Sequence, residues 1–74
     1  SNVTLYPNPA GQHEVLRVAG ADAGAQATVV DAMGRQVWSG VLAPNGNRLG
    51  LRTGSYVVRI QTAEGVIRQR LLVR

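Results

Sequence analysis

The chain has 74 residues, of which 45% are apolar, and its eight basic residues against four acidic ones give a formal net charge of +4. A chain this short forms one domain and buries only about 60% of the surface that its unfolded form exposes. The absence of cysteine excludes a disulfide framework and a thiolate metal site. No apolar stretch approaches the roughly 18 residues that a membrane-spanning helix needs.

Hydrophobic residues recur mainly with a period of two along the chain, which is typical of strands. The sequence predicts seven short strands, at residues 3–6, 14–18, 27–31, 36–39, 48–51, 55–61 and 66–74. Turn residues separate them, beginning with Pro7 and Pro9, which end the first strand because proline fixes φ and lacks an N–H. Seven strands at this spacing predict an all-β antiparallel sandwich.

The segment "AMGR" (32–35) is predicted to join two strands as a hairpin. Gly34 takes the positive φ that such a turn requires, and Asp31 is interpreted as a turn residue that bonds its own backbone rather than as a metal ligand. Farther along, "APNGN" (43–47) is a second turn signal, and Leu49 and Leu51 are expected on one face of the strand that follows.

The last two predicted strands show the clearest alternation. Tyr56, Val58 and Ile60 share the face expected to be buried. In the terminal strand, the outer face is predicted to carry Arg68, Arg70, Leu72 and Arg74, and the inner face Ile67, Gln69, Leu71 and Val73. Two interpretations stay open: arginines that protect a sheet edge from aggregation, which the pattern alone favours, or a strip whose open edge pairs with a partner strand.

Residues that could carry chemistry are few. His13 and Glu14 are neighbours and would point to opposite faces of a strand, and the glycine-rich segment 20–25 lacks the residues of a phosphate-binding loop. Three aromatic residues do not supply a stacking platform for nucleic acid. No catalytic residue, metal, cofactor, small-molecule substrate or nucleic-acid partner is therefore expected.

Four motifs occur in a characteristic order: "LYPNPA" (5–10), "VVDAMGRQV" (29–37), a Gly-x-Tyr segment that runs from Leu51 through "GSYVVRI" (51–60) and "RQRLLVR" (68–74). Together they resemble the type A C-terminal sorting domain of the type IX secretion system, the Por secretion tail family of Bacteroidetes-type bacteria. The resemblance covers nearly the whole chain. It implies a seven-stranded Ig-like β-sandwich that acts as an address signal and not as an enzyme.

The resemblance also implies the partners and the route. A covalently linked N-terminal cargo would cross the periplasm, the type IX outer-membrane translocon and its shuttle proteins would recognise the sorting domain, and a sortase-like peptidase would remove it. The cargo would then remain at the outer-membrane surface or be secreted.

An alternative is an Ig-like accessory module that binds carbohydrate or protein, for which an exposed Trp38 would be the platform. Residues 1–2 are interpreted as the remnant of a tag, and residues 3–74 as a single domain.

The resemblance assigns roles to individual residues. The motif residues are Pro7, Asn8, Pro9, Asp31, Gly34, Gly54 and Tyr56, and the residues implied in recognition by the translocon or sortase are Arg68, Arg70, Leu71, Leu72, Val73 and Arg74. Pro7 and Pro9 are expected to give an extended link. Gly54 is expected to supply turn geometry, and the Tyr56 hydroxyl to tie down a neighbouring connection. The arginines stand where the family often has lysine, and the segment 49–54 is shorter than usual.

Overall fold

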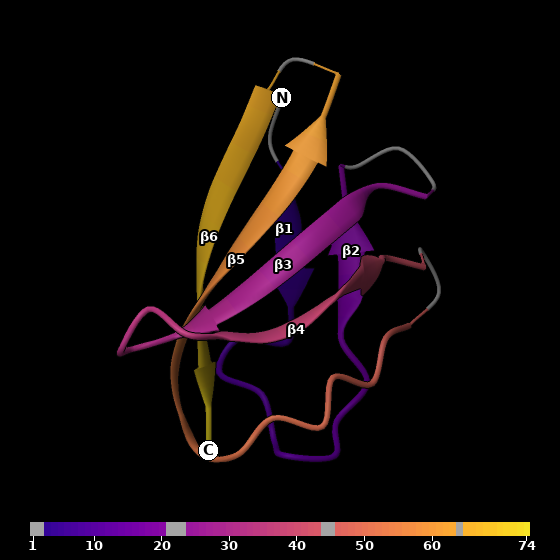
Figure 1. Cartoon of the computed structure of the whole chain (residues 1–74). Coiled ribbons are helices and arrows are strands. Elements are labelled where there is room, and N and C mark those ends of the chain that lie inside the picture. Colours follow the sequence, from indigo (N-terminus) through magenta and orange to yellow (C-terminus); the bar gives the residue numbers. More distant parts are fainter. Residues whose placement is uncertain (1–2, 21–23, 44–45, 64) are drawn as a thin grey trace.

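The computed structural model describes residues 3–20, 24–43, 46–63 and 65–74, and these ranges contain six strands. The strands are β1 (Thr4–Tyr6), β2 (Arg17–Ala19), β3 (Gln26–Asp31), β4 (Gln36–Val41), β5 (Gly54–Thr62) and β6 (Gly65–Val73). The first two form one antiparallel sheet, and the other four form a second in the order β4-β3-β5-β6. The protein is therefore all-β, with the small sheet behind the large one in Figure 1.

Both sheets contribute to one aliphatic core. Its buried hydrophobic residues are Val3, Leu5, Ala10, Leu16, Ala27, Val29, Leu42, Leu51, Tyr56, Val58, Ile60, Leu71 and Val73. Because side chains alternate along a strand, Tyr56, Val58 and Ile60 all face inward from β5, as the sequence predicts. In the part of the chain that is described, no helix is long and apolar enough to cross a membrane.

The β5–β6 hairpin is the longest pairing of the molecule, running from Gly54 opposite Val73 to Thr62 opposite Gly65. Its register fixes the two faces of β6. The outward residues are Val66, Arg68, Arg70 and Leu72, and the inward ones are Ile67, Gln69, Leu71 and Val73. The predicted alternation of the terminal strand is confirmed.

Two of the predicted strands were wrong: one does not form, and the other has different bounds. Residues 48–51 form no strand, although Leu51 is buried and Leu49 packs against the core. The second strand covers Arg17–Ala19 rather than 14–18, because a turn precedes it in which the Glu14 carboxylate accepts the N–H of Gly11 at 2.8 Å. The described residues therefore hold six strands where seven were expected.

Asn47 anchors the start of residues 48–51, the segment that forms no strand. Its backbone exchanges two hydrogen bonds with Leu16, and its buried carboxamide bonds both the N–H and the C=O of Ala43 at 2.7 and 2.8 Å. A carboxamide offers the same donor and acceptor as a peptide group, so it replaces a missing strand partner. The predicted tag remnant at 1–2 and parts of the predicted turns at 20–25, 43–47 and 63–65 lie outside the described residues.

Candidate functional site

The predicted motifs converge at one end of the molecule, the lower end in Figure 1. Asp31 lies opposite Tyr56 in the β3–β5 ladder, and Tyr56 lies opposite Leu71 in the β5–β6 ladder. The central motif, the Gly-x-Tyr motif and the terminal segment therefore form one row across the large sheet. We call Asp31, Tyr56 and Leu71 the motif row.

The β3–β4 hairpin gives the row its first residue. The Asp31 carboxylate accepts the backbone N–H groups of Met33 and Arg35, each at 2.9 Å, and the Arg35 guanidinium at 3.1 Å. Gly34 has a φ of +83° and donates its N–H to the Asp31 carbonyl. The prediction that Asp31 and Gly34 build this turn is confirmed.

These bonds act on the acidity of the Asp31 carboxyl. The backbone N–H of Arg35 is the main cause that lowers the pKa of this group below its ordinary value of 3.8. The Met33 N–H and the Arg35 guanidinium act in the same direction, while loss of water around the carboxylate opposes them. Asp31 is therefore a charged turn residue.

Tyr56 joins the row to the loop before β5. Its ring is buried, and its hydroxyl donates a 2.7 Å hydrogen bond to the carbonyl of Arg52. The expectation that this hydroxyl ties down a neighbouring connection is confirmed. The role expected for Gly54 was wrong: it starts β5, is not among the glycines with positive φ, and lies beside the Tyr56 ring, where a Cβ would be 3.6 Å from the hydroxyl oxygen.

The opening motif pairs with the end of β6. The Asn8 carboxamide donates to the carbonyl of Arg70 at 2.8 Å and accepts the N–H of Leu72 at 3.1 Å. Ala10 continues the contact as a parallel bridge, its N–H bonding Leu72 and its carbonyl accepting the N–H of Arg74. The prediction of an extended link at Pro7 and Pro9 was wrong, because this segment is bonded to the body; the peptide bonds before both prolines are cis.

Gln69 makes an equivalent contact between the two sheets. Its inward carboxamide accepts the N–H of Leu5 at 2.9 Å and donates to the Leu5 carbonyl at 3.2 Å. Six hydrogen bonds therefore join residues 5–10 to residues 69–74, two each at Leu5, Asn8 and Ala10. We call this set of contacts the seam.

The seam changes the interpretation of the terminal strand. One of the two open interpretations had a partner strand pairing with an open edge, but residues 8–10 already occupy the edge at Arg70, Leu72 and Arg74. What this end of β6 displays is side chains: those three residues are exposed, whereas Leu71 and Val73 are 0% and 3% exposed. Recognition by pairing is excluded at this part of the edge as long as the seam is closed.

A comparison with protein-family models matches residues 4–74 with the secretion system C-terminal sorting domain. The chain belongs to this family. It is a C-terminal sorting signal of the type IX secretion system, which implies an attached cargo, interaction with the type IX machinery and export across the outer membrane to the surface or the medium. A search of curated proteins found no match.

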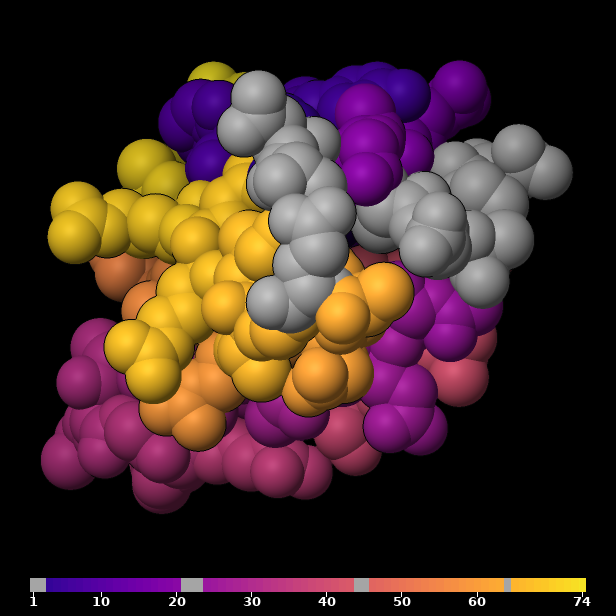
Figure 2. Space-filling model, turned by 90° about the horizontal axis from the view of Figure 1, so that it is seen from above, coloured from indigo at the N-terminus to yellow at the C-terminus, as the bar shows by residue number. Residues whose placement is uncertain are grey.

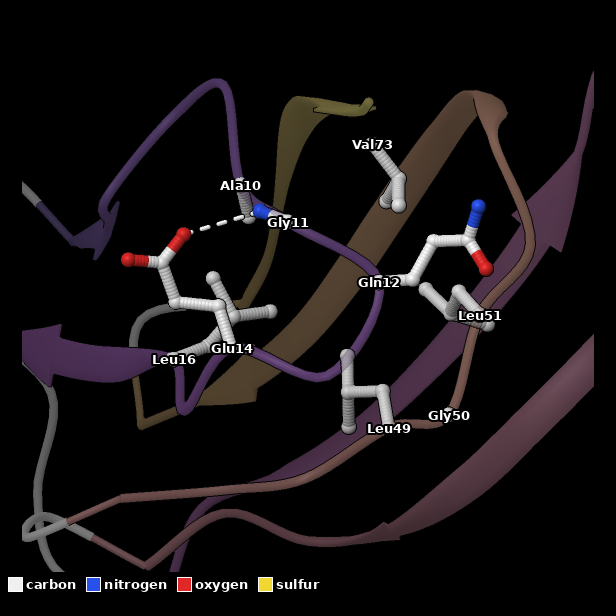
Figure 3. A pocket seen from close by; sticks show the side chains of 9 residues that line it. All are labelled: Ala10, Gly11, Gln12, Glu14, Leu16, Leu49, Gly50, Leu51 and Val73. Atoms are coloured by element: carbon white, nitrogen blue, oxygen red, sulfur yellow. Dashed lines mark hydrogen bonds between the residues drawn. The ribbon is translucent and has the colours of Figure 1, made fainter.

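A small hollow lies beside the seam of this sorting domain (Figure 3). Its lining includes Ala10 and Val73 from the seam side and Leu49 and Leu51 from the loop before β5. Its volume is about 10 Å³, enough for about one water molecule and far below the several hundred Å³ of a ligand pocket. This hollow is therefore too small to hold a small-molecule ligand.

Other candidate residues of the sorting domain lie apart from the motif row. Trp38 is half-buried and packs against the core, with its ring over Gly40, so it is not the exposed platform that the carbohydrate-binding alternative requires. His13 is exposed in a turn. Among the described residues, no three histidine or carboxylate side chains gather as metal ligands do.

Proposed function

We propose that the chain is the removable tail of an exported cargo and that the outward side chains at the end of β6 are the surface that the export machinery reads. These side chains belong to Arg68, Arg70, Leu72 and Arg74. The observation that carries the proposal is the seam, which fixes this end of the strand from one side while the motif row fixes it from the other. Leu71 and Val73 serve recognition indirectly, by anchoring the strand.

The proposed route follows from the family's role. The cargo enters the periplasm by an ordinary signal peptide, shuttle proteins and the outer-membrane translocon bind the folded domain, and a sortase-like peptidase then separates the domain from the cargo. The cargo is released or attached to the cell surface. The domain has no catalytic part in these steps.

We also propose that the two sheets form an Ig-like β-sandwich. Support comes from the antiparallel pairing in both sheets, from their shared core and from the bond between the Tyr56 hydroxyl and the Arg52 carbonyl, which resembles a tyrosine corner. An experimental structure in which the small sheet does not cover the inner face of the large one would contradict this assignment.

An export assay tests the recognition surface. Residues 3–74 are fused behind a periplasmic reporter in a type IX-competent bacterium, and reporter outside the cell is measured. We expect export of the unchanged fusion and a large loss for Arg70→Gln combined with Arg74→Gln. The matched control, Arg17→Gln with Arg48→Gln, removes the same charge from exposed sites elsewhere. Retention of the unchanged fusion in the periplasm would sink the proposed function.

Point substitutions are more informative here than truncation. Deleting residues 71–74 removes two buried side chains and the seam bonds of Leu72 and Arg74, so it unfolds part of the domain as well as removing the recognised groups. The exposed arginines are not part of the buried core and allow the two effects to be separated. Thermal unfolding of each variant domain verifies that the fold is kept.

A further inference from the structure

We propose that the outer face of the large sheet binds an acidic protein surface through Arg59, Arg68 and Arg70, a set that we call the arginine face. This rests on the proposed function, because it names the chemistry of a partner in the export machinery. The inference also goes beyond the proposed function, because Arg59 lies on β5, outside the terminal segment. The partner is a protein that presents neighbouring carboxylates.

The ladder places these three cations side by side. Arg59 lies directly opposite Arg68, and Arg70 is the next outward residue of β6, opposite Val57. Opposed Cα atoms are about 4.5–5.5 Å apart, and residues two apart on a strand are about 6.6 Å apart. All three side chains are exposed. Like charges directly opposite each other destabilise a sheet, so this arrangement does not serve the fold.

Nothing described on the same face neutralises the arginine face. Within the described ranges, the ion pair that forms joins Arg35 to Asp31 at the hairpin. Glu14, the other acidic residue described, bonds Gly11 in the turn before β2. The residue opposite Arg59 on β3 is Thr28. The three guanidinium groups are thus available to carboxylates from outside.

Exposed aliphatic side chains lie on the same outer face as the cations. Val41, Val66 and Leu72 are 56%, 55% and 42% exposed, and all three point outward from the large sheet. Next to Arg59 is an open hollow of about 220 Å³, lined by Gln26, Thr28, Arg59, Gln61 and Val66. Figure 2 shows side chains in the yellow of β6 standing out from the body. Arginine is enriched at protein interfaces, and the apolar side chains on the same face offer surface that a partner can bury.

The aromatic residues argue against a membrane or a nucleic acid as the partner. Membrane interfaces favour Trp and Tyr, and single-stranded nucleic acid is stacked on aromatic side chains. Here Trp38 and Tyr56 face the core, and Tyr6 lies on β1 of the other sheet. The spacing of the cations instead fits two carboxylates about 5–7 Å apart, as on one face of a helix at i and i+4 or on paired strands.

Arg59→Glu is the decisive variant. It places a glutamate opposite Arg68, an opposite-charge pair that supports the sheet, so we expect a midpoint of thermal unfolding equal to or above that of the unchanged chain. In the export assay we expect at least a fivefold loss. The matched control Arg17→Glu makes the same charge change on β2 and should be exported normally. Normal export of Arg59→Glu would overturn the proposal; retention of the unchanged fusion would instead refute the proposed function.

A binding measurement tests the partner chemistry without export. The probes are a helical peptide carrying glutamates at i and i+4 beside leucines, its glutamine counterpart, and vesicles of phosphatidylglycerol with lipopolysaccharide. In amide NMR spectra of the 74-residue chain, we expect the glutamate peptide to shift Arg59, Val66 and Arg68, less at high salt and not in Arg59→Glu. Equal shifts with the glutamine peptide, no shifts, or binding to vesicles alone would overturn the proposal.

Discussion

The carboxamide of Asn8 bonds two backbone groups of the last strand at once, the carbonyl of Arg70 and the N–H of Leu72. It therefore occupies the position that a neighbouring strand would take. The opening motif and the terminal segment, which lie at opposite ends of the sequence, form one structural unit. A change at Asn8 should be felt at the end of β6.

Replacing Asn8 with alanine should loosen the end of β6. Loss of two partly solvated hydrogen bonds should lower the free energy of unfolding by about 1 kcal/mol, or about 4–8 °C in the unfolding midpoint of a domain this small. Hydrogen exchange should accelerate at the Leu72 amide more than at amides in the middle of β3. The control Asn8→Asp keeps the acceptor for Leu72 and should retain part of that protection. Unchanged exchange at Leu72 in Asn8→Ala would contradict the bonding described.

Gln69→Met should be more costly than its conservative shape suggests. The thioether fills a similar volume but leaves the N–H and C=O of Leu5 without their partners, and a buried unpaired polar group costs about 1–3 kcal/mol. Gln61→Met, on the outer face of β5, is the matched control and should change stability little. Urea unfolding of both variants measures the difference; equal stabilities would show that the sheets do not depend on this amide.

The alternation of β5 and β6 could be predicted because it depends on a local property. Successive side chains of a strand point to opposite faces, so apolar residues at every second position identify the buried face without knowledge of the partner strand. The turn at Asp31 and Gly34 was predictable for the same reason, since its hydrogen bonds are all local. These elements account for two strands of the large sheet and for all three residues of the motif row.

The seam could not be predicted, because its hydrogen bonds join residues more than 60 positions apart. The sequence marks Asn8 as a motif residue and Gln69 as a polar residue on an inward face, but it does not show which backbone groups their carboxamides bond. The prediction of a strand at residues 48–51 was wrong for a related reason. The alternation of Leu49 and Leu51 indicates which side of the chain meets the core, but it does not indicate whether the backbone pairs with another strand. The arginine face was missed because the pairing of Arg59 with Arg68 depends on the β5–β6 register.

Tyr56→Phe should reveal the value of the hydroxyl bond at the start of β5. The ring stays buried, but the Arg52 carbonyl loses a 2.7 Å donor, so we expect a loss of about 1–2 kcal/mol in the free energy of unfolding. Tyr6→Phe removes a hydroxyl from an exposed side chain of β1 and should have almost no effect. If the two variants were equally stable, the hydroxyl would not hold the loop in solution.

Asp31 should make the stability of the domain depend on pH in the acid range. The folded-state pKa is lowered by the Arg35 and Met33 N–H groups, so the unfolded chain binds a proton at this carboxyl at a higher pH than the folded chain does. The stabilisation is therefore complete above the ordinary pKa of 3.8 and is lost as the pH falls through the lower folded value.

The unfolding midpoint, followed from pH 7 to pH 2, tests this sign. We expect the unfolding midpoint to decrease once the pH is below about 4. Asp31→Asn should flatten that part of the profile, because its side chain does not titrate. Arg35→Gln is the matched control: it removes the guanidinium but keeps the two backbone N–H donors, so most of the acid-dependent fall should remain. A profile for Asp31→Asn that parallels the unchanged chain would assign the acid sensitivity to other carboxyl groups. The turn would then be held by its backbone bonds, from Gly34 N–H to the Asp31 carbonyl and from Asp31 N–H to the Arg35 carbonyl.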